Sequence, residues 1–88
     1  MKESILRSVS PSVPLHALAE GKHGTITKLC ASGGMRRRLL DIGMVEGTKI
    51  ACVQKSPWGD PVAYGVRGAV IALRTRDAAQ ILVSPAAG

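Results

Sequence analysis

Two histidines and one glutamate lie close together in the N-terminal part of the chain, at His16, Glu20 and His23. Imidazole nitrogens and carboxylate oxygens are ligands that zinc and related divalent transition metals accept. His16 and Glu20 are four residues apart, so a helical turn would place them on one face, with His23 three residues further along. These three residues are therefore the candidate ligands of a weak surface site for a divalent transition metal, and no cofactor is required. The favoured interpretation of the pattern is two solvated histidines at loop edges.

Three consecutive arginines, Arg36, Arg37 and Arg38, follow the pair Gly33-Gly34. Guanidinium groups bind phosphates, and the free backbone N–H groups at a helix start bind anions as well. Three neighbouring residues span about 200° of a helix, so at least one arginine must flank the buried face and pack its aliphatic stem there. The run predicts either a structural anchor or a contact to an acidic partner.

The helix that carries these arginines also has a leucine outside its apolar stripe. Met35, Leu39 and Ile42 fall on one side at helical spacing, whereas Leu40 falls on a flank beside Arg36. A large apolar side chain next to an arginine is a combination favoured at the centre of interfaces. Burial of Leu40 under a loop is the alternative. We assign partner contact to this flank and the loop after it: Arg36, Arg37, Leu40, Gly43 and Met44.

The common catalytic motifs are missing from the sequence. There is no glycine-rich phosphate-binding loop ending in Lys-Ser or Lys-Thr, no Gly-x-Ser-x-Gly and no His-Glu-x-x-His. The six acidic residues are scattered singly and only two histidines are present, which leaves little from which to build an acid/base pair. We expect a protein that is not an enzyme, and we assign no catalytic residue.

Composition limits the partners. The chain has 88 residues, of which 45% are hydrophobic, so it forms one small folded domain. Its net charge of +6 points to an acidic protein, nucleic acid or an anionic membrane surface. One Trp and one Tyr, with no Phe, offer few side chains on which bases could stack. Because no membrane-spanning run and no signal peptide are recognisable, we expect a cytoplasmic protein.

The elements that must position these residues can be located along the chain. We expect a flexible leader over residues 1–13, one domain over 14–84 and a tail over 85–88. Within the domain the pattern predicts a short helical turn near Leu15 and Leu18, and a helix over 35–42 that ends at Gly43. Thr75 is the candidate N-cap of a last short turn. Strands are predicted at 25–30, 48–55, 61–66, 69–74 and 81–83.

The two strands around Arg67-Gly68 form a predicted hairpin. If these two residues are the turn, Val66 faces Ala69, and Tyr64 and Val62 face Ile71 and Leu73 on the same side. The opposite side is small and apolar, so either another element covers it or it is a contact face, for instance between two copies in a homodimer; it holds Ala63, Gly65, Val70 and Ala72. Five short strands and one helix favour an antiparallel barrel of the SH3-like or OB type.

The stretch from Gly34 to Thr48, together with Gly59-Asp60-Pro61 and Val66-Arg67-Gly68, resembles the FeoA family, ferrous iron transport protein A. The similarity runs from Pro14 to Val83 in family order. It implies a mainly all-β fold, an SH3-like antiparallel barrel with one short α-helix inserted after the first strand. Glu46 stands where the family commonly has proline, and Gly65, Ala69 and Val70 replace larger or more polar residues.

The resemblance implies a non-enzymatic cytoplasmic accessory protein of ferrous iron uptake. Such a protein would bind and regulate the membrane transporter FeoB through its cytoplasmic G-protein region, and would lie at the inner face of the membrane through that partner. No binding to nucleic acid is expected. Two other readings stay open: an SH3-like module of an iron-dependent transcriptional repressor, and a basic barrel that binds nucleic acid.

Overall fold

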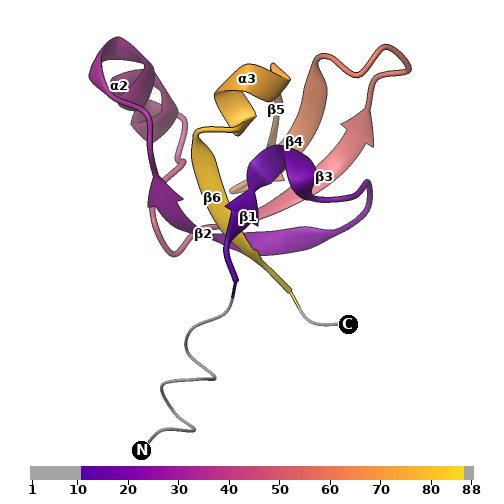
Figure 1. The fold of residues 1–88 in the computed structure, drawn as a ribbon, viewed down its shortest axis with the longest axis horizontal. Coiled ribbons are helices and arrows are strands. Elements are labelled where there is room, and N and C mark those ends of the chain that lie inside the picture. Colours follow the sequence, from indigo (N-terminus) through magenta and orange to yellow (C-terminus); the bar gives the residue numbers. More distant parts are fainter. Residues whose placement is uncertain (1–10, 87–88) are drawn as a thin grey trace, which may run out of the picture.

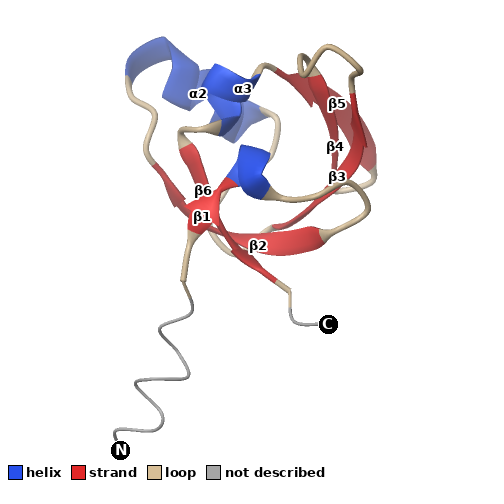
Figure 2. Ribbon diagram, turned by 45° about the vertical axis from the view of Figure 1, so that its right-hand side comes forward, coloured by secondary structure: helices blue, strands red, loops and turns tan. Residues whose placement is uncertain are grey.

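The computed structural model describes residues 11–86, which form a strongly curved β-sheet with short helices in the connections between its strands (Figures 1 and 2). Three helical segments lie in this part of the chain: η1 (Leu15–Ala17), α2 (Gly33–Asp41) and α3 (Thr75–Ala78). The strands of the described residues are β1 (Val13–Pro14), β2 (His23–Leu29), β3 (Lys49–Lys55), β4 (Val62–Val66), β5 (Ala69–Leu73) and β6 (Ile81–Pro85).

Both ends of the fold reach beyond the boundaries that the sequence indicated. Val13 pairs with Val83 and Pro14 with Leu82, so the domain begins inside the segment predicted as a leader. Strand β6 continues to Pro85, the first residue of the predicted tail. Residues 1–10 and 87–88 lie outside the described residues, and the predictions for them stay predictions. Because β1 precedes β2, the inserted helix follows the second strand rather than the first.

The sheet is antiparallel throughout, with the strand order β1-β6-β2-β3-β4-β5. Its pairing shifts by one residue between Ile26 and Lys28 in β2, and between Cys52 and Gln54 in β3. Bulges of this kind bend a strand and increase its twist. The two bulges lie in the central strands, so they curve the sheet around one core.

The β4–β5 hairpin has the predicted register. Val66 pairs with Ala69, and Tyr64 pairs with Ile71. Arg67 and Gly68 both have positive φ, 53° and 81°, as a two-residue type I′ turn requires. The alternation of side chains therefore places Tyr64 inside and its neighbours in the sequence outside.

The core draws on nearly every element. Helix α2 contributes Leu39, which is fully buried, while Met35 and Ile42 pack at the edge of the core, so the predicted apolar stripe is confirmed. The other fully buried large side chains come from η1, the strands and the loop after α2: Leu15, Met44, Ile26, Ile50, Tyr64, Ile81 and Val83.

Helix α3 begins differently from the prediction. Its N-cap residue is Arg74 rather than Thr75, and Arg74 makes no side-chain capping bond. The cap comes instead from the β3–β4 loop, because Asp60 Oδ1 accepts hydrogen bonds from the Thr75 hydroxyl at 2.6 Å and the Thr75 N–H at 2.7 Å. These bonds hold the pKa of the Asp60 carboxyl below its usual range. The Gly-Asp-Pro turn thus has a structural role.

Tyr64 gives the fold an alkaline limit. Its side chain is fully buried, and its hydroxyl finds no hydrogen-bond partner among the described residues. Burial raises the pKa of Tyr64 to about 12, whereas an unfolded chain releases this proton near pH 10. The unfolded state therefore holds fewer protons than the folded state between these values, and stability must fall as the pH rises from about 10 to 12.

Tyr64→Phe tests this limit. The variant should raise the free energy of unfolding at neutral pH by about 1 kcal/mol, because it removes an unpaired buried hydroxyl. It should also lose less stability than the parent between pH 10 and 12. Urea unfolding at several pH values measures both effects, and parallel alkaline losses in the two proteins would show that Tyr64 is not the group responsible.

Candidate partner-binding site

Helix α2 holds the candidate site, and its two ends fix its position. It starts after Ser32 and stops at a Schellman motif, in which the Gly43 N–H donates to the Leu40 carbonyl (3.0 Å) and the Met44 N–H to the Leu39 carbonyl (2.9 Å). Gly43 has a φ of +100°, which other residues adopt only with strain. Because Leu39 and Met44 are both buried, this end of the helix is fastened to the core.

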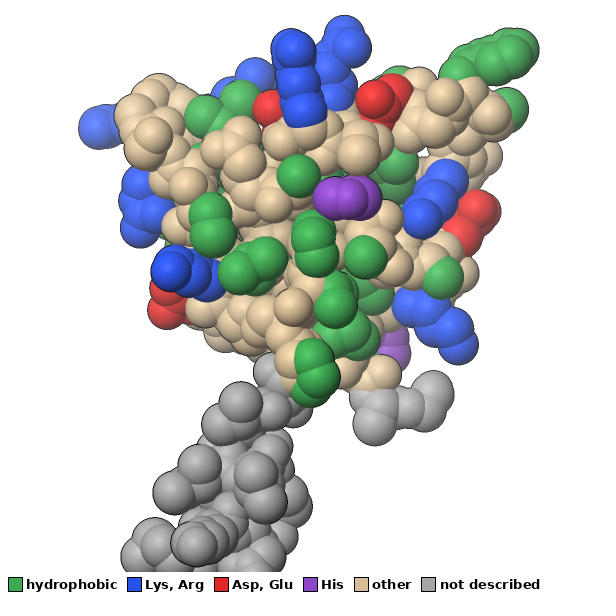
Figure 3. Space-filling model, in the orientation of Figure 1, with side chains coloured by type: hydrophobic (Ala, Val, Ile, Leu, Met, Phe, Trp, Pro, Cys, Tyr) green, Lys and Arg blue, Asp and Glu red, His purple; other side chains and the backbone are tan. Residues whose placement is uncertain are grey.

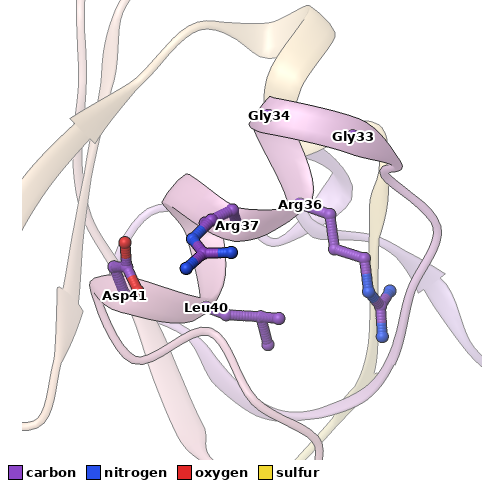
Figure 4. A pocket seen from close by; sticks show the side chains of 6 residues that line it. All are labelled: Gly33, Gly34, Arg36, Arg37, Leu40 and Asp41. Atoms are coloured by element: carbon purple, nitrogen blue, oxygen red, sulfur yellow. The ribbon is translucent and has the colours of Figure 1, made fainter.

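The opposite side of α2 forms an open hollow of about 500 Å³. Leu40 is 38% exposed there, and Figure 4 shows its side chain between those of Arg36 and Arg37. Burial of Leu40 under a loop, the alternative considered from the sequence, is not what the structure shows. The hollow is lined by Gly33, Gly34, Arg36, Arg37, Leu40 and Asp41. It combines apolar surface with two guanidinium groups and one carboxylate, a composition suited to an acidic protein surface.

Arg36 has a structural bond within this hollow. Its Nη1 donates a hydrogen bond of 3.0 Å to the Leu29 carbonyl at the end of β2. The bond ties α2 to the strand that precedes it, so Arg36 is the structural anchor that the arginine run predicted. Arg37 is exposed on the same side as Leu40 and is the better candidate for a direct contact.

Met44 is not part of this surface. It was assigned to partner contact, but it is fully buried, because the residue after a Schellman glycine packs back on the last turn of the helix. Gly43 is half-buried, and a Cβ placed on it would lie 3.1 Å from Arg67 Cδ. The Arg67 stem from the β4–β5 turn therefore lies against the end of α2, a tertiary contact that sequence reasoning missed and no local pattern signals.

The predicted metal ligands do not come together. No group of three His, Cys, Asp or Glu side chains that could hold a metal occurs within residues 11–86. Helix η1 ends at Ala17, so the turn that would align His16 with Glu20 does not continue. The chain then turns at Gly21, which has a φ of +85°, and His23 starts β2 as an exposed residue.

The predicted contact face on the hairpin is continuous in the structure. Ala63 pairs with Ala72 and Gly65 with Val70, and all four lie on the outer side of the sheet. Ala63 and Gly65 are half-buried, while Ala72 is exposed and Val70 is 66% exposed. A Cβ placed on Gly65 would lie 3.3 Å from Val53 Cγ2, so the Val53 side chain of β3 reaches over this glycine.

A curved antiparallel sheet with one helix between its second and third strands defines a small SH3-like barrel. The chain belongs to the FeoA family, because the family model of the FeoA domain matches residues 13–85. No helix in the described residues has the length and apolar character needed to cross a membrane.

Relatives support this assignment. The chain is 38% identical over 69 residues to the Fe(2+) transport protein A/Fe(2+) transporter FeoB fusion protein of Porphyromonas gingivalis. The matched region covers 78% of this chain and 8% of the fusion protein. Among solved structures, the FeoA-like protein of Clostridium acetobutylicum has a TM-score of 0.83 at 29% identity, covering 91% of this chain and 93% of that one. FeoA of Stenotrophomonas maltophilia, a prokaryotic SH3 domain protein complexed with zinc, has a TM-score of 0.67 at 27% identity, covering 84% and 89%.

The fold also occurs in repressors. A manganese-dependent transcriptional repressor has a TM-score of 0.79 at 20% identity, covering 89% of this chain and 44% of the repressor. At this identity the similarity shows the fold alone.

Proposed function

We propose that this chain is an accessory protein of ferrous iron transport that binds the cytoplasmic part of a FeoB transporter through the exposed side of α2. It requires no cofactor and catalyses no reaction. The observation that carries the proposal is the placement of Leu40, which is 38% exposed beside Arg37 on a helix whose opposite side is fastened to the core. Because the helix that carries Leu40 is already fixed on the core, a partner that covers this side chain does not have to order the backbone around it.

The relative from Porphyromonas gingivalis supports the choice of partner. Its name joins Fe(2+) transport protein A and the FeoB transporter in one fusion protein. A covalent link holds two domains at a high effective concentration, which is useful where the domains contact each other. Such a contact would place this chain at the cytoplasmic side of the membrane beside its partner.

The charge distribution supports a protein partner over nucleic acid. The net charge is +6, but on the face drawn in Figure 3 lysine and arginine side chains are spread around the periphery, with hydrophobic side chains between them. Domains that bind nucleic acid through phosphates commonly gather their basic residues in one patch or stripe.

Binding to the immobilised cytoplasmic domain of a FeoB transporter tests the site. Leu40→Ala should weaken binding by more than about 1 kcal/mol, roughly fivefold in Kd, with little change in melting temperature. Arg37→Glu should weaken it as well, because it places a carboxylate opposite an acidic surface. Arg36→Glu is a poorer test, since it would also break the bond to Leu29.

Lys49→Glu is the matched control. Lys49 is an exposed residue of β3 outside the hollow, and its reversal changes the net charge by the same amount as Arg37→Glu. We expect this control to bind nearly as well as the parent. Equal losses for Lys49→Glu and Arg37→Glu would indicate attraction by overall charge only, and full binding by Leu40→Ala would remove α2 from the interface.

A further inference from the structure

Trp58 is the most exposed large hydrophobic side chain of the described residues, at 91%. It is the single tryptophan of the chain and lies in the β3–β4 loop, which projects from the barrel at the upper right of Figure 1. Tryptophan is enriched among the residues that carry most of the binding energy in protein interfaces. A surface that covers this ring would gain the free energy of its burial.

The loop holds Trp58 in a defined place. The Gly59 N–H donates to the Ser56 carbonyl at 2.9 Å, which closes a tight turn with Trp58 inside it. At the base of the loop the Ser56 hydroxyl donates to the Pro61 carbonyl, and the Asp60 carboxylate caps α3. Because the loop is fastened on both sides, a partner that covers the ring does not have to order the backbone that carries it.

A hollow of about 270 Å³ lies at the foot of the same loop. Two of its residues, Ala63 and Ala72, pair across β4 and β5 and belong to the outer face of the hairpin. Pockets for drug-sized ligands usually measure about 300–1,000 Å³, so this hollow suits one large side chain rather than a whole small molecule. We call it the loop hollow; it is lined by Gln54, Ser56, Pro57, Pro61, Ala63 and Ala72.

The chemistry of the loop hollow fits an indole ring. Its two prolines and two alanines offer apolar surface, and proline rings pack well on aromatic rings. A buried indole N–H needs an acceptor, which the side-chain oxygen of the exposed Gln54 can supply. Among the described residues that line the hollow none is charged, although the chain has a net charge of +6. An acidic protein, a nucleic acid or an anionic lipid would therefore find no counter-charge in it.

The chain itself carries both halves of this contact, and this selects the occupant. Pro57 lines the loop hollow, so Trp58 stands at its rim, but at 91% exposure the ring does not fill the hollow of its own chain. Because ring and hollow lie side by side, one two-fold axis between two copies places each ring in the hollow of the other. Such an arrangement makes two identical contacts and closes at a dimer.

The area fits a weak dimer. Two aromatic side chains bury about 150–250 Å² each, and the surface that covers them loses a similar area. Together they supply roughly half of the 1,200–2,000 Å² that a specific interface usually buries. The uncharged outer face of the hairpin adjoins the hollow and adds apolar area through Val70, which is 66% exposed.

We propose that two copies of this chain associate with Trp58 of each copy seated in the loop hollow of the other, where its indole N–H donates to Gln54. The contact goes beyond the proposed function. It shares no lining residue with the hollow on α2, so the exposed side of that helix stays available to the transporter in the dimer.

The single tryptophan makes the test direct. On dilution the emission of Trp58 should lie at the long wavelength of an indole in water, and it should move to shorter wavelength as the concentration of the full chain rises. Sedimentation should show monomer turning into dimer over the same range of concentration. Trp58→Ala should weaken dimerisation by at least about tenfold and leave the melting temperature unchanged, because the ring is exposed in the monomer.

Ala72→Glu tests the other half of the contact. It places a charge in the loop hollow, so it should weaken dimerisation by at least about tenfold and keep the emission of Trp58 at long wavelength. It also lowers the net positive charge, so greater repulsion between the copies does not account for the loss. Ala19→Glu is the matched control, since it makes the same substitution at an exposed residue outside the hollow, and it should dimerise like the parent.

Four results would overturn the proposal. Short-wavelength emission at every dilution of a monomer would mean that the ring folds onto its own chain. A dimer that persists in both Trp58→Ala and Ala72→Glu would place the association elsewhere, and equal losses for Ala72→Glu and Ala19→Glu would reduce it to charge. A chain that stays monomeric, and whose binding to the FeoB cytoplasmic domain falls with Trp58→Ala, would assign the loop to the transporter instead.

Discussion

Leu39→Ala should lower the free energy of unfolding by about 2–5 kcal/mol, the usual range for removing a buried leucine side chain. Leu39 is 1% exposed and is the residue through which α2 enters the core. Its carbonyl also accepts a hydrogen bond from the Met44 N–H. The cavity left by the missing side chain would therefore lie next to the Schellman motif that ends α2. A domain of this size has a total stability toward the low end of about 5–15 kcal/mol, and such a loss would leave much of the protein unfolded on mild heating.

Leu40→Ala is the matched control for this prediction. It removes the same atoms from the next residue of the same helix, but Leu40 is 38% exposed and lines the hollow rather than the core. Its cost in stability should stay below about 1 kcal/mol, in keeping with surface positions. Chemical unfolding of both variants gives the comparison. Equal losses would mean that α2 is rotated relative to the structure, and the candidate site on its exposed side would then lose its basis.

Local patterns predicted much of the fold. The register of β4 with β5 follows from two turn residues and strict alternation, both of which are visible in the sequence. The buried side of α2 follows from helical spacing, and the end of the helix follows from Gly43. Strand β1 was missed because a strand of two residues is too short to show an alternation of apolar and polar side chains, although it extends the sheet beyond β6.

The site was harder to predict, for reasons that lie outside any local pattern. The role of Asp60 depends on a partner in α3, and that of Arg36 on the carbonyl of Leu29. The separation along the chain between the two partners of each hydrogen bond does not follow from the periodicity of a helix or a strand. The predicted grouping of His16, Glu20 and His23 is not found in the described residues, because it assumed a full helical turn after His16, whereas helix η1 ends at Ala17. The burial of Met44, by contrast, could have been predicted, since the residue after the glycine of a Schellman motif packs on the last turn of the helix.

Gly43→Ala is expected to cost about 1–3 kcal/mol, the range for a residue other than glycine held in a sparsely populated region of the backbone. The φ of +100° at this position lies well beyond the small left-handed region that side chains tolerate. The new Cβ would also meet Arg67 Cδ at 3.1 Å, so the stem of that arginine must move. The turn between β4 and β5 should therefore respond to a change at the end of α2.

Gly34→Ala provides the contrast. Gly34 lies in the same helix without a positive φ, and a Cβ there would meet nothing within 4 Å. Alanine forms helices better than glycine, so this variant should gain about 0.5–1 kcal/mol. Thermal unfolding of the two variants separates backbone strain from a general effect of adding a methyl group. Because Gly43 supports both Met44 and Arg67, a stable Gly43→Ala variant would mean that the helix end can relax, and that α2 does not hold Leu40 in one fixed position.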